Sequence, residues 1–243
     1  MIANLEHVVV VVTGANGGLG AAIVRVLAAR GATVVAHVRQ AESLPGGVAS
    51  TVIADLGDPA AAGRIMAETL SVHGRVDGLV NCAGVQPVVP FAAISDEEWQ
   101  QMLDINLSAA HRLTQHAAAA MKDHGGGSIV HIASIEGSRP AVGHAHYAVS
   151  KAGLIMHAKA AALELGPIGV RVNAVSPGLL AREGLDDDWP EGIARWVQRA
   201  PLGRLGTGED VAQACAFLLS PESSFITGTD LIVDGGMSAC PSW

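Results

Sequence analysis

The chain has 243 residues, and its 23 acidic and 15 basic side chains give a formal net charge of −8 at pH 7. This balance argues against a nucleic-acid-binding face, which needs a concentrated basic patch, and gives no support for docking on anionic membranes. Hydrophobic residues make up 49% of the chain and charged residues 16%, so a large core of mainly aliphatic side chains is possible.

The cysteines and the N-terminal segment indicate a reducing compartment. Cys82, Cys215 and Cys240 include no closely spaced pair, so neither a disulfide framework nor a zinc knuckle is indicated. The apolar run Val8–Val12 is too short for a membrane span or a signal segment, and we expect a cytoplasmic protein. The acidic run Asp186–Asp188 has no further ligands at metal spacing, so we expect a solvated loop and no metal.

Short β-branched runs alternate with helix-like stretches along the chain, which is typical of a parallel sheet with crossover helices. The expected strands are His7–Thr13, Thr33–Val38, Thr51–Ala54, Val76–Asn81, Ser128–Ala133, Val170–Val175 and Asp230–Val233. The expected helices are Gly18–Arg30, Pro59–His73, Asp96–Lys122, Tyr147–Gly166 and Glu209–Leu219. We therefore predict one α/β domain over residues 1–243: a doubly wound Rossmann sheet of about seven parallel strands, with helices on both faces and ligands at the carboxyl ends of the strands.

One segment departs from this alternation. Between Pro177 and Gly208 no strand is evident, and short helical pieces with several glycines and prolines fill the gap. An excursion of this length in a compact domain is usually functional, so we expect a substrate lid at about 178–208. Trp189 and Trp196 either cap a hydrophobic substrate or anchor the lid.

A glycine-rich turn joins the first expected strand to the first expected helix. Its glycines, Gly14, Gly18 and Gly20, permit unusual backbone angles and a close approach to a pyrophosphate. The helix that follows offers free N–H groups and the positive end of its dipole to phosphates. A merely flexible turn is the alternative, but the strand–turn–helix context favours dinucleotide binding.

Tyr147 and Lys151 are four residues apart in an expected helix, so they lie one turn apart on the same face. Hydride transfer to a ketone leaves an alkoxide that needs a proton, and a phenol can supply it. Because a free phenol has a pKa of about 10, a nearby ammonium and the positive ring of a nicotinamide must favour the phenolate before the tyrosine becomes a useful base. The alternative is an ordinary half-buried tyrosine beside a surface lysine.

The order and spacing of these motifs resemble the short-chain dehydrogenase/reductase family over almost the whole chain. The turn has the family's Gly-x-x-x-Gly-x-Gly spacing, and residues 81–84 stand for its Asn-Asn-Ala-Gly with Cys82 in second place. The resemblance implies an NAD(P)-dependent oxidoreductase that moves a hydride between the cofactor and a carbonyl or secondary alcohol. It implies a catalytic set of Asn106, Ser134, Tyr147 and Lys151.

The resemblance also assigns roles to individual residues. Ser134 would stabilise charge on the substrate oxygen, Lys151 would reach the nicotinamide ribose, and Asn106 would hold a water of a proton relay. Asp55 and Leu56 would contact adenine. The implied cofactor contacts are Gly14, Asn16, Gly18, Leu19, Gly20, Arg39, Asp55, Leu56, Asn81, Ala83, Gly84, Tyr147, Lys151, Pro177, Gly178 and Leu180.

The end of the second strand favours NADP(H), with NAD(H) possible. Val38 stands where the family's NAD enzymes place an aspartate, and its neighbour Arg39 can pair with a 2′-phosphate. His37 could add partial positive charge. Against this, Gly17 stands where many NADP-preferring relatives have a second basic residue. Arg39 as a solvated charge is the alternative.

The candidates for the substrate pocket are Ser134, Glu136, His144 and Arg182. Arg182 could bind a substrate carboxylate or lie on the surface.

A small free carbonyl or alcohol is the expected substrate, because residues 126–128 lack an arginine that is common in reductases that dock an acyl carrier. The alternatives are reduction of a 3-oxoacyl thioester (ACP or CoA) and a non-catalytic, cofactor-binding regulator. Enoyl reductases of the family space Tyr and Lys more widely, so enoyl reduction is not the expected activity. The resemblance implies a homo-oligomer, a dimer or tetramer.

Overall fold

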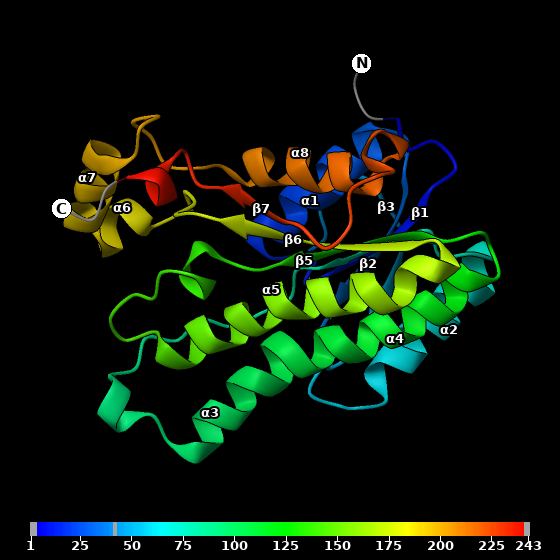
Figure 1. Cartoon of the computed structure of the whole chain (residues 1–243), viewed down its shortest axis with the longest axis horizontal. Coiled ribbons are helices and arrows are strands. Elements are labelled where there is room, and N and C mark those ends of the chain that lie inside the picture. The colour runs from blue at the N-terminus through cyan, green and yellow to red at the C-terminus, as the bar shows by residue number, and fades with distance from the viewer. Residues whose placement is uncertain (1–3, 41–42, 241–243) are drawn as a thin grey trace.

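The computed structural model describes residues 4–40 and 43–240, and its centre is one parallel sheet of seven strands in the order β3-β2-β1-β4-β5-β6-β7 (Figure 1). The expected doubly wound α/β sheet is thereby confirmed. The strands are β1 (Val9–Thr13), β2 (Thr33–Val38), β3 (Val48–Ile53), β4 (Gly78–Asn81), β5 (Gly127–Ile132), β6 (Val170–Pro177) and β7 (Asp230–Val233).

Helices cover both faces of the sheet (Figure 1). On one face lie α1 (Gly18–Ala29) and α8 (Gly208–Leu219), and on the other lie α2 (Ala61–His73), α4 (Ala109–Lys122) and α5 (Ala145–Leu165). Successive strand residues point to opposite faces, so the valines of β1 divide between two fully buried cores. Val10 packs in the core with Ile23 of α1, whereas Val11 packs in the core with Leu113 of α4.

Several element boundaries differ from the expected ones. Strand β3 begins at Val48, earlier than the expected start at Thr51. The strand lies at the sheet edge, and its mixed polar and apolar residues give no apolar run that would mark its start in the sequence. Helix α2 begins at Ala61 after a turn in which Asp58 accepts a bond from the Ala60 amide. Helix α5 begins at Ala145, two residues before the tyrosine expected to open it. Short 3₁₀ helices cover Phe91–Ala93, Ile135–Gly137, Gly166–Ile168, Pro221–Ser223 and Met237–Ala239.

The expected single helix over residues 96–122 is interrupted. Helix α3 (Asp96–Leu103) passes into a π-helical turn (Asp104–Ser108) before α4 begins. At the end of that turn the Ala109 amide donates to the Asp104 carbonyl, five residues back. Such wide turns occur most often at functional sites, because they displace one side chain out of the regular helical register. Here that turn contains Asn106.

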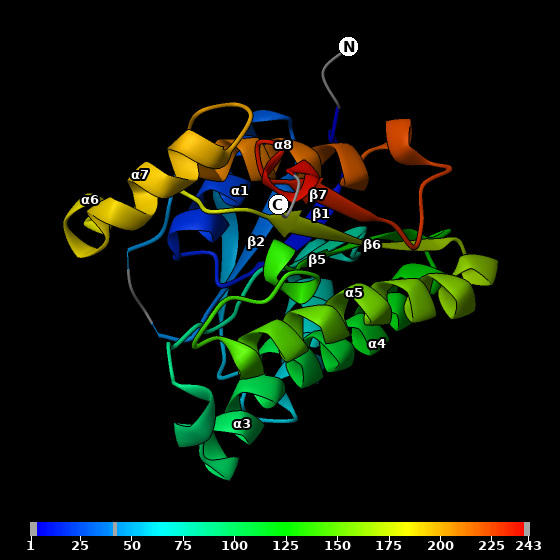
Figure 2. The same ribbon diagram turned by 60° about the vertical axis from the view of Figure 1, so that its left-hand side comes forward.

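The segment after β6 contains α6 (Leu185–Asp188) and α7 (Pro190–Arg199), which lie beyond the carboxyl ends of the strands (Figures 1 and 2). The only pairing between residues 178 and 207 that the described structure records is an isolated bridge from Leu180 to Gly206. The run Asp186–Asp188 belongs to α6 and is exposed, so the expectation of a loop was wrong. Among the described residues, no helix is long and apolar enough to cross a membrane, and no cluster of three or more His, Cys, Asp or Glu side chains could hold a metal ion.

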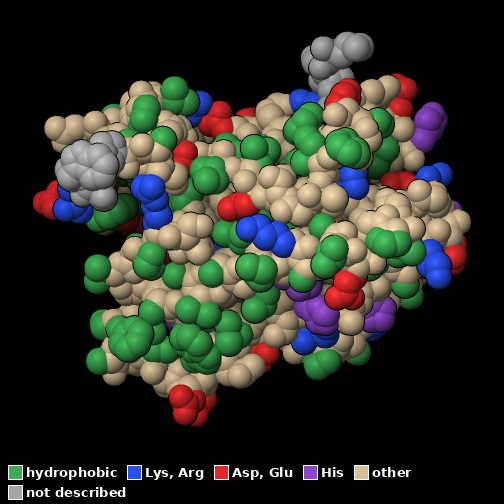
Figure 3. Space-filling model, viewed as in Figure 1, with side chains coloured by type: hydrophobic (Ala, Val, Ile, Leu, Met, Phe, Trp, Pro, Cys, Tyr) green, Lys and Arg blue, Asp and Glu red, His purple; other side chains and the backbone are tan. Residues whose placement is uncertain are grey.

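Three histidines connect the centre of the sheet to the outer face of α4 and α5, where histidine side chains gather (Figure 3). The Asn81 amide lies 3.0 Å from His131 Nδ1, His131 Nε2 lies 3.0 Å from His157 Nδ1, and His157 Nε2 lies 3.1 Å from His111 Nδ1. Burial, and then the charges of His157 and Lys151, lower the pKa of His131 to about 3. His131 is therefore a neutral core residue at neutral pH.

Candidate active site

The glycine-rich turn between β1 and α1 leaves room for a phosphate-bearing ligand. Gly14 has a φ of +65°, and a Cβ there would stand 2.9 Å from Ala83 Cα. A Cβ on Gly20 would overlap the Gly14 carbonyl, whereas one on Gly18 would meet nothing within 4 Å. The turn is therefore closed beneath and open above, at the N-terminus of α1, where N–H groups and the helix dipole favour an anion. A dinucleotide pyrophosphate fits this cradle.

Thr13 joins the phosphate turn to the turn that follows β4. Its Oγ1 accepts hydrogen bonds from the amides of Cys82 and Ala83, both at 3.0 Å. Gly84 comes next, and a Cβ there would lie 3.2 Å from Asn106 Oδ1 and 3.6 Å from Lys151 Nζ. The candidate cofactor residues of the two turns are thus brought together and adjoin Asn106 and Lys151.

A cavity of about 640 Å³ lies at the carboxyl ends of β2 and β3. Its lining includes Arg39, Asp55, Gly57 and Ile105, together with residues at the start of α3. Val38 is buried in the core beneath α1, so it leaves Arg39 as the exposed side chain at the end of β2. This is the expected location of the adenosine half of a dinucleotide, and Ile105 is a lining residue that the sequence reading missed.

His37 does not supply the positive charge suggested from the sequence. Its side chain is buried, and Nε2 lies 3.0 Å from the Ala54 carbonyl oxygen. Burial lowers the pKa of His37, and the bond to Ala54 and the charge of Asp55 oppose this only in part. The imidazole is therefore neutral at neutral pH, and Arg39 is the only candidate for a cationic contact at this end of β2 within the described structure.

The four candidate catalytic side chains meet above the carboxyl ends of β4 and β5. Tyr147 and Lys151 lie on one face of α5, with Lys151 Nζ 5.5 Å from the centroid of the Tyr147 ring. Ser134 follows β5, and its side chain accepts from the Glu136 amide at 3.1 Å. All four side chains are nearly buried, with exposed fractions of 1% for Asn106, 8% for Ser134, 9% for Tyr147 and 5% for Lys151.

The protonation of the Tyr147–Lys151 pair is controlled mainly by burial. Burial raises the pKa of Tyr147 to about 12, while a hydrogen bond with Ser134 lowers it and the charge of Glu136 raises it further. Burial lowers the pKa of Lys151 to about 8, against the opposing effect of Cys82. Lys151 by itself therefore does not lower the pKa of Tyr147, so the positive nicotinamide ring, the second expected contribution, is needed to make the phenolate accessible.

Asn106 is held firmly by the protein. Its Oδ1 accepts from the Val85 amide at 2.9 Å, and its Nδ2 donates to the Val85 carbonyl at 3.0 Å and to Ser150 Oγ at 3.1 Å. Ser150 in turn donates to the Tyr147 carbonyl at 2.7 Å. The sequence reading missed Ser150, although its position between Tyr147 and Lys151 was the available signal.

The lid candidate follows the end of β6, and several of its polar contacts lie within the segment itself. Gly178 packs where a Cβ would meet the Trp196 ring at 2.8 Å, so that tryptophan anchors α7 close to the strand end. Arg182 donates to Asp188 at 2.7 Å and to the Glu183 carbonyl at 3.2 Å, and its side chain is 58% exposed. Its guanidinium is therefore engaged within the lid candidate itself.

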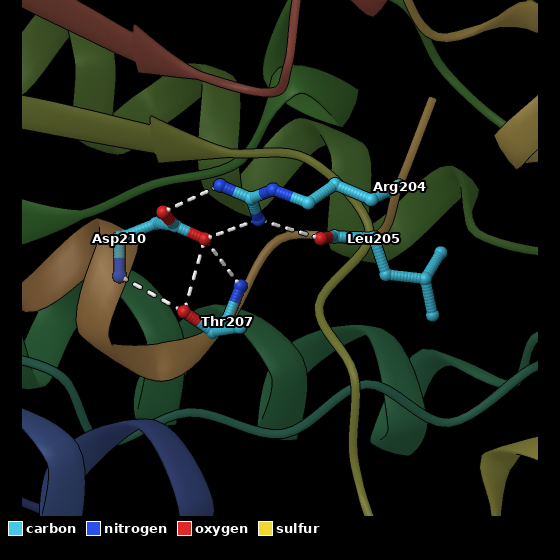
Figure 4. A network of polar contacts seen from close by, with 4 residues as sticks. All are labelled: Arg204, Leu205, Thr207 and Asp210. Carbon is cyan, nitrogen blue, oxygen red and sulfur yellow. Dashed lines mark hydrogen bonds and ion pairs between the residues drawn. The ribbon is translucent and has the colours of Figure 1, made fainter. Parts of the chain in front are cut away.

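A polar network fixes the far end of this segment at the start of α8 (Figure 4). Arg204 forms a two-pronged ion pair with Asp210, at 2.7 and 2.9 Å, and also donates to the Leu205 carbonyl. Asp210 and Thr207 cap α8 reciprocally. The pKa of Asp210 is lowered mainly by Arg204. The segment between residues 178 and 203 is thus fixed at both ends, and between them it is held by the contact of Trp196 with Gly178 and by the bond from the Leu202 amide to the Gly235 carbonyl.

The fold and the cradle together define a doubly wound α/β protein of the dinucleotide-binding class. A family model described as enoyl-(acyl carrier protein) reductase matches residues 14–238. The 3-oxoacyl-[acyl-carrier-protein] reductase FabG of Escherichia coli K12 is 37% identical, over 96% of this chain and 98% of that protein. The L-rhamnose 1-dehydrogenase (NAD(P)(+)) of Azotobacter vinelandii is 36% identical, over 94% and 95%.

The 3beta-hydroxysteroid dehydrogenase 1 of Eggerthella lenta is also 36% identical, over 100% of this chain and 98% of that protein. A solved structure described as a short-chain alcohol dehydrogenase from Sinorhizobium meliloti 1021 superposes with a TM-score of 0.92 at 30% identity, over 99% of this chain and 100% of that one. The chain belongs to the short-chain dehydrogenase/reductase family. It is an NAD(P)-dependent oxidoreductase that acts on CH–OH groups and the corresponding carbonyls.

Proposed function

We propose that the chain is a carbonyl reductase and alcohol dehydrogenase that prefers NADP(H) and accepts NAD(H), with Asn106, Ser134, Tyr147 and Lys151 as its active-site residues. The observation that carries the proposal is the meeting of Tyr147, Lys151 and Ser134 beside a glycine cradle that fits a dinucleotide. The bound nicotinamide supplies or accepts the hydride. Each remaining step belongs to side chains of this chain.

In the reductive direction Ser134 donates a hydrogen bond to the substrate oxygen and stabilises the negative charge that develops there. Tyr147 then gives its phenolic proton to that oxygen, and in oxidation it takes the proton back. Lys151 supplies positive charge beside the ring and holds the ribose hydroxyls. Asn106 positions Ser150 and the Val85 backbone beneath the pair, in addition to any water it holds for proton transfer.

Arg39 supports the preference for NADP(H), because a guanidinium pairs well with a 2′-phosphate and Val38 offers no carboxylate to repel it. Carboxyl groups of Asp55, Asp96 and Glu97 share the cavity with Arg39 and weaken that attraction. We therefore propose a preference for NADP(H) without exclusion of NAD(H). The candidate cofactor contacts other than Arg39 would hold NADP(H) and NAD(H) alike.

The favoured substrate is a small free ketone or secondary alcohol, closed off by a lid at about 178–208. Reduction of a 3-oxoacyl thioester is the second candidate function, and the FabG relatives support it. Residues 126–128 offer no arginine to an acidic carrier, which favours the free substrate. A non-catalytic regulator is disfavoured, since all four active-site residues stand together.

We also propose that two copies pack through α4 and α5. Val149, Met156 and Leu163 recur every seven residues on α5 and are 46%, 62% and 81% exposed, which is unusual for large apolar side chains on a helix that also faces the core. Sedimentation of the native protein and of Met156→Asp tests this contact, because the charge should yield a smaller species.

The free thiols of Cys82, Cys215 and Cys240 suit a cytoplasmic location.

A panel of ketones, alcohols, 3-oxoacyl thioesters and enoyl thioesters, each with all four nicotinamide forms, tests the proposed function. We expect turnover of free ketones with NADPH and a decrease of about 10²- to 10⁴-fold in kcat for Tyr147→Phe. Cofactor binding without turnover of any substrate, unchanged in Tyr147→Phe, would instead identify a regulator. Turnover of the thioesters alone would favour the second candidate function.

A further inference from the structure

Three polar side chains from separate segments form a connected row beside the active site. Glu136 Oε2 lies 2.8 Å from His144 Nδ1, and Gln86 Nε2 donates to Glu136 Oε1 at 3.3 Å. Gln86 follows β4, Glu136 lies in the 3₁₀ helix after β5, and His144 directly precedes α5. The Glu136 and His144 side chains are 17% and 16% exposed, so they form a half-buried pair, unlike the solvated ion pairs elsewhere on the surface.

This row adjoins both groups that handle the substrate oxygen. The His144 and Tyr147 rings meet edge to face, with centroids 6.0 Å apart. Glu136 donates its backbone N–H to Ser134 Oγ at 3.1 Å. The carboxylate is also close enough to contribute, after burial and the Ser134 hydrogen bond, to the pKa of Tyr147. Any substrate whose reacting carbon lies between Ser134 and Tyr147 therefore has Glu136 and His144 as near neighbours.

In its neutral form, the His144 ring is restricted to one tautomer by this pairing. A carboxylate oxygen only accepts, so the proton of the neutral imidazole lies on Nδ1, next to Glu136. Nε2 then carries a lone pair and can accept a hydrogen bond, as in other carboxylate–histidine pairs that set the tautomer of the ring. A group that satisfies Nε2 must be a donor, and a hydroxyl of the substrate is the simplest one.

We propose that Glu136 and His144 select substrates that carry a hydroxyl on the carbon next to the reacting carbon, namely α-hydroxy ketones and vicinal diols. In oxidation, the carbinol carbon gives its hydride to the oxidised nicotinamide and its hydroxyl proton to Tyr147. The neighbouring hydroxyl donates to His144 and is unchanged. This inference rests on the proposed function and names its substrate class.

Two features disfavour other substrates at this position. A hydrocarbon chain next to the carbonyl would leave the imidazole lone pair without a partner in a half-buried place, which is costly. A carboxylate on the same carbon, as in an α-keto acid, would be repelled by Glu136 at short range. A neutral, hydroxyl-bearing carbon avoids both costs.

The experiment compares matched substrate pairs with the purified full chain: acetoin against butanone, and cyclohexanediol against cyclohexanol. We expect kcat/KM to favour the hydroxylated member by about tenfold or more, which corresponds to one hydrogen bond in a partly buried site. His144→Leu and Glu136→Gln should bring the ratio close to one. His144→Gln keeps an acceptor oxygen and should retain part of the preference.

Glu68→Gln and His124→Gln are matched controls, because both residues are exposed and lie on or after helices remote from the site, and they should keep the native ratio. Circular dichroism and NADPH fluorescence verify that each variant is folded and binds cofactor. Three outcomes would overturn this inference while the proposed function stands. They are equal kcat/KM for both members of a pair, an undiminished ratio in His144→Leu and Glu136→Gln, and turnover confined to carbonyls without the hydroxyl. Absence of turnover on the whole panel would instead refute the proposed function.

Discussion

Lys151 Nζ stands 5.5 Å from the centre of the Tyr147 ring but donates its hydrogen bond to the Ile132 carbonyl, at 2.8 Å. The lysine is thus anchored to the end of β5 and acts on the tyrosine through space. Burial raises the pKa of the Tyr147 phenol and lowers that of the Lys151 amine, so little of Tyr147 is ionised at neutral pH in the protein alone. An oxidised nicotinamide would supply the further positive charge when it is bound.

Tyr147 is the only tyrosine in the chain, so its ionisation can be followed directly by tyrosinate absorbance. In the free protein we expect the phenolate to form with a pKa of about 12, above the ordinary 10.0, because burial disfavours the charge. Addition of NADP⁺ should lower this pKa by at least about one unit, since the ring charge is brought beside the phenolate. A free-protein pKa at or below the ordinary value would contradict this account of the site.

Arg39 is expected to determine the cofactor preference. Arg39→Ala should weaken NADPH binding about ten- to hundredfold, the range for loss of a charge-assisted hydrogen bond, and should change the ratio of NADPH to NADH affinity by the same factor. Fluorescence titration with both cofactors measures the ratio. Arg64→Ala is the matched control, because Arg64 is similarly exposed and pairs with Asp58. A preserved ratio in Arg39→Ala would mean that Arg39 is merely solvated.

Arg182 can read a substrate carboxylate only if it releases Asp188. Arg182→Ala should therefore reduce the preference for ketones with a remote carboxylate over their neutral amides, while Asp188→Asn should increase it by freeing the guanidinium. The two variants are compared by kcat/KM on the same ketone pair. If both leave the selectivity unchanged, Arg182 serves only to hold α6.

The buried histidines should make folding stability fall in mild acid. His131 keeps a pKa of about 3 when folded but 6.5 when unfolded, so between these values only the unfolded chain binds its proton. Stability attributable to this residue is complete above about pH 6.5 and is lost toward pH 3. Each proton costs about 1.4 kcal/mol per pH unit in this window. His131→Asn should reduce the slope of unfolding free energy against pH, measured by urea denaturation, by one proton, whereas exposed His124→Asn should not.

Much of the fold could be predicted from local pattern. Buried strands such as β1 are continuous valine runs, and glycine stops such as Gly74, with a φ of +73°, end helices where expected. Edge strand β3 was misplaced because Ser50 and Thr51 interrupt its apolar residues, so the sequence shows no continuous apolar run. The π-helical turn was missed because contacts of Asn106 with Val85 and Ser150, distant in sequence, impose it.

The candidate site shows the same division. The helical spacing of Tyr147 and Lys151 was sufficient to place them on one face, and the glycine spacing was sufficient to indicate the cradle. The pairing of Glu136 with His144, and its link to Gln86, depends on how three loops fold together. The neutral state of His37 depends on its depth in the sheet, which residue type alone does not reveal.

The contact between Gly14 and Ala83 couples two loops that come from neighbouring strands. With Thr13 bonded to both amides that follow β4, and no space for a Cβ on Gly14, neither loop can shift without moving the other. The turn before α1 and the turn after β4 therefore form one connected frame, on which we propose that both ends of the cofactor would be held. We therefore expect changes in substrate selectivity to arise in the segment between residues 178 and 203 and in the row of Gln86, Glu136 and His144, because neither includes a residue of this frame.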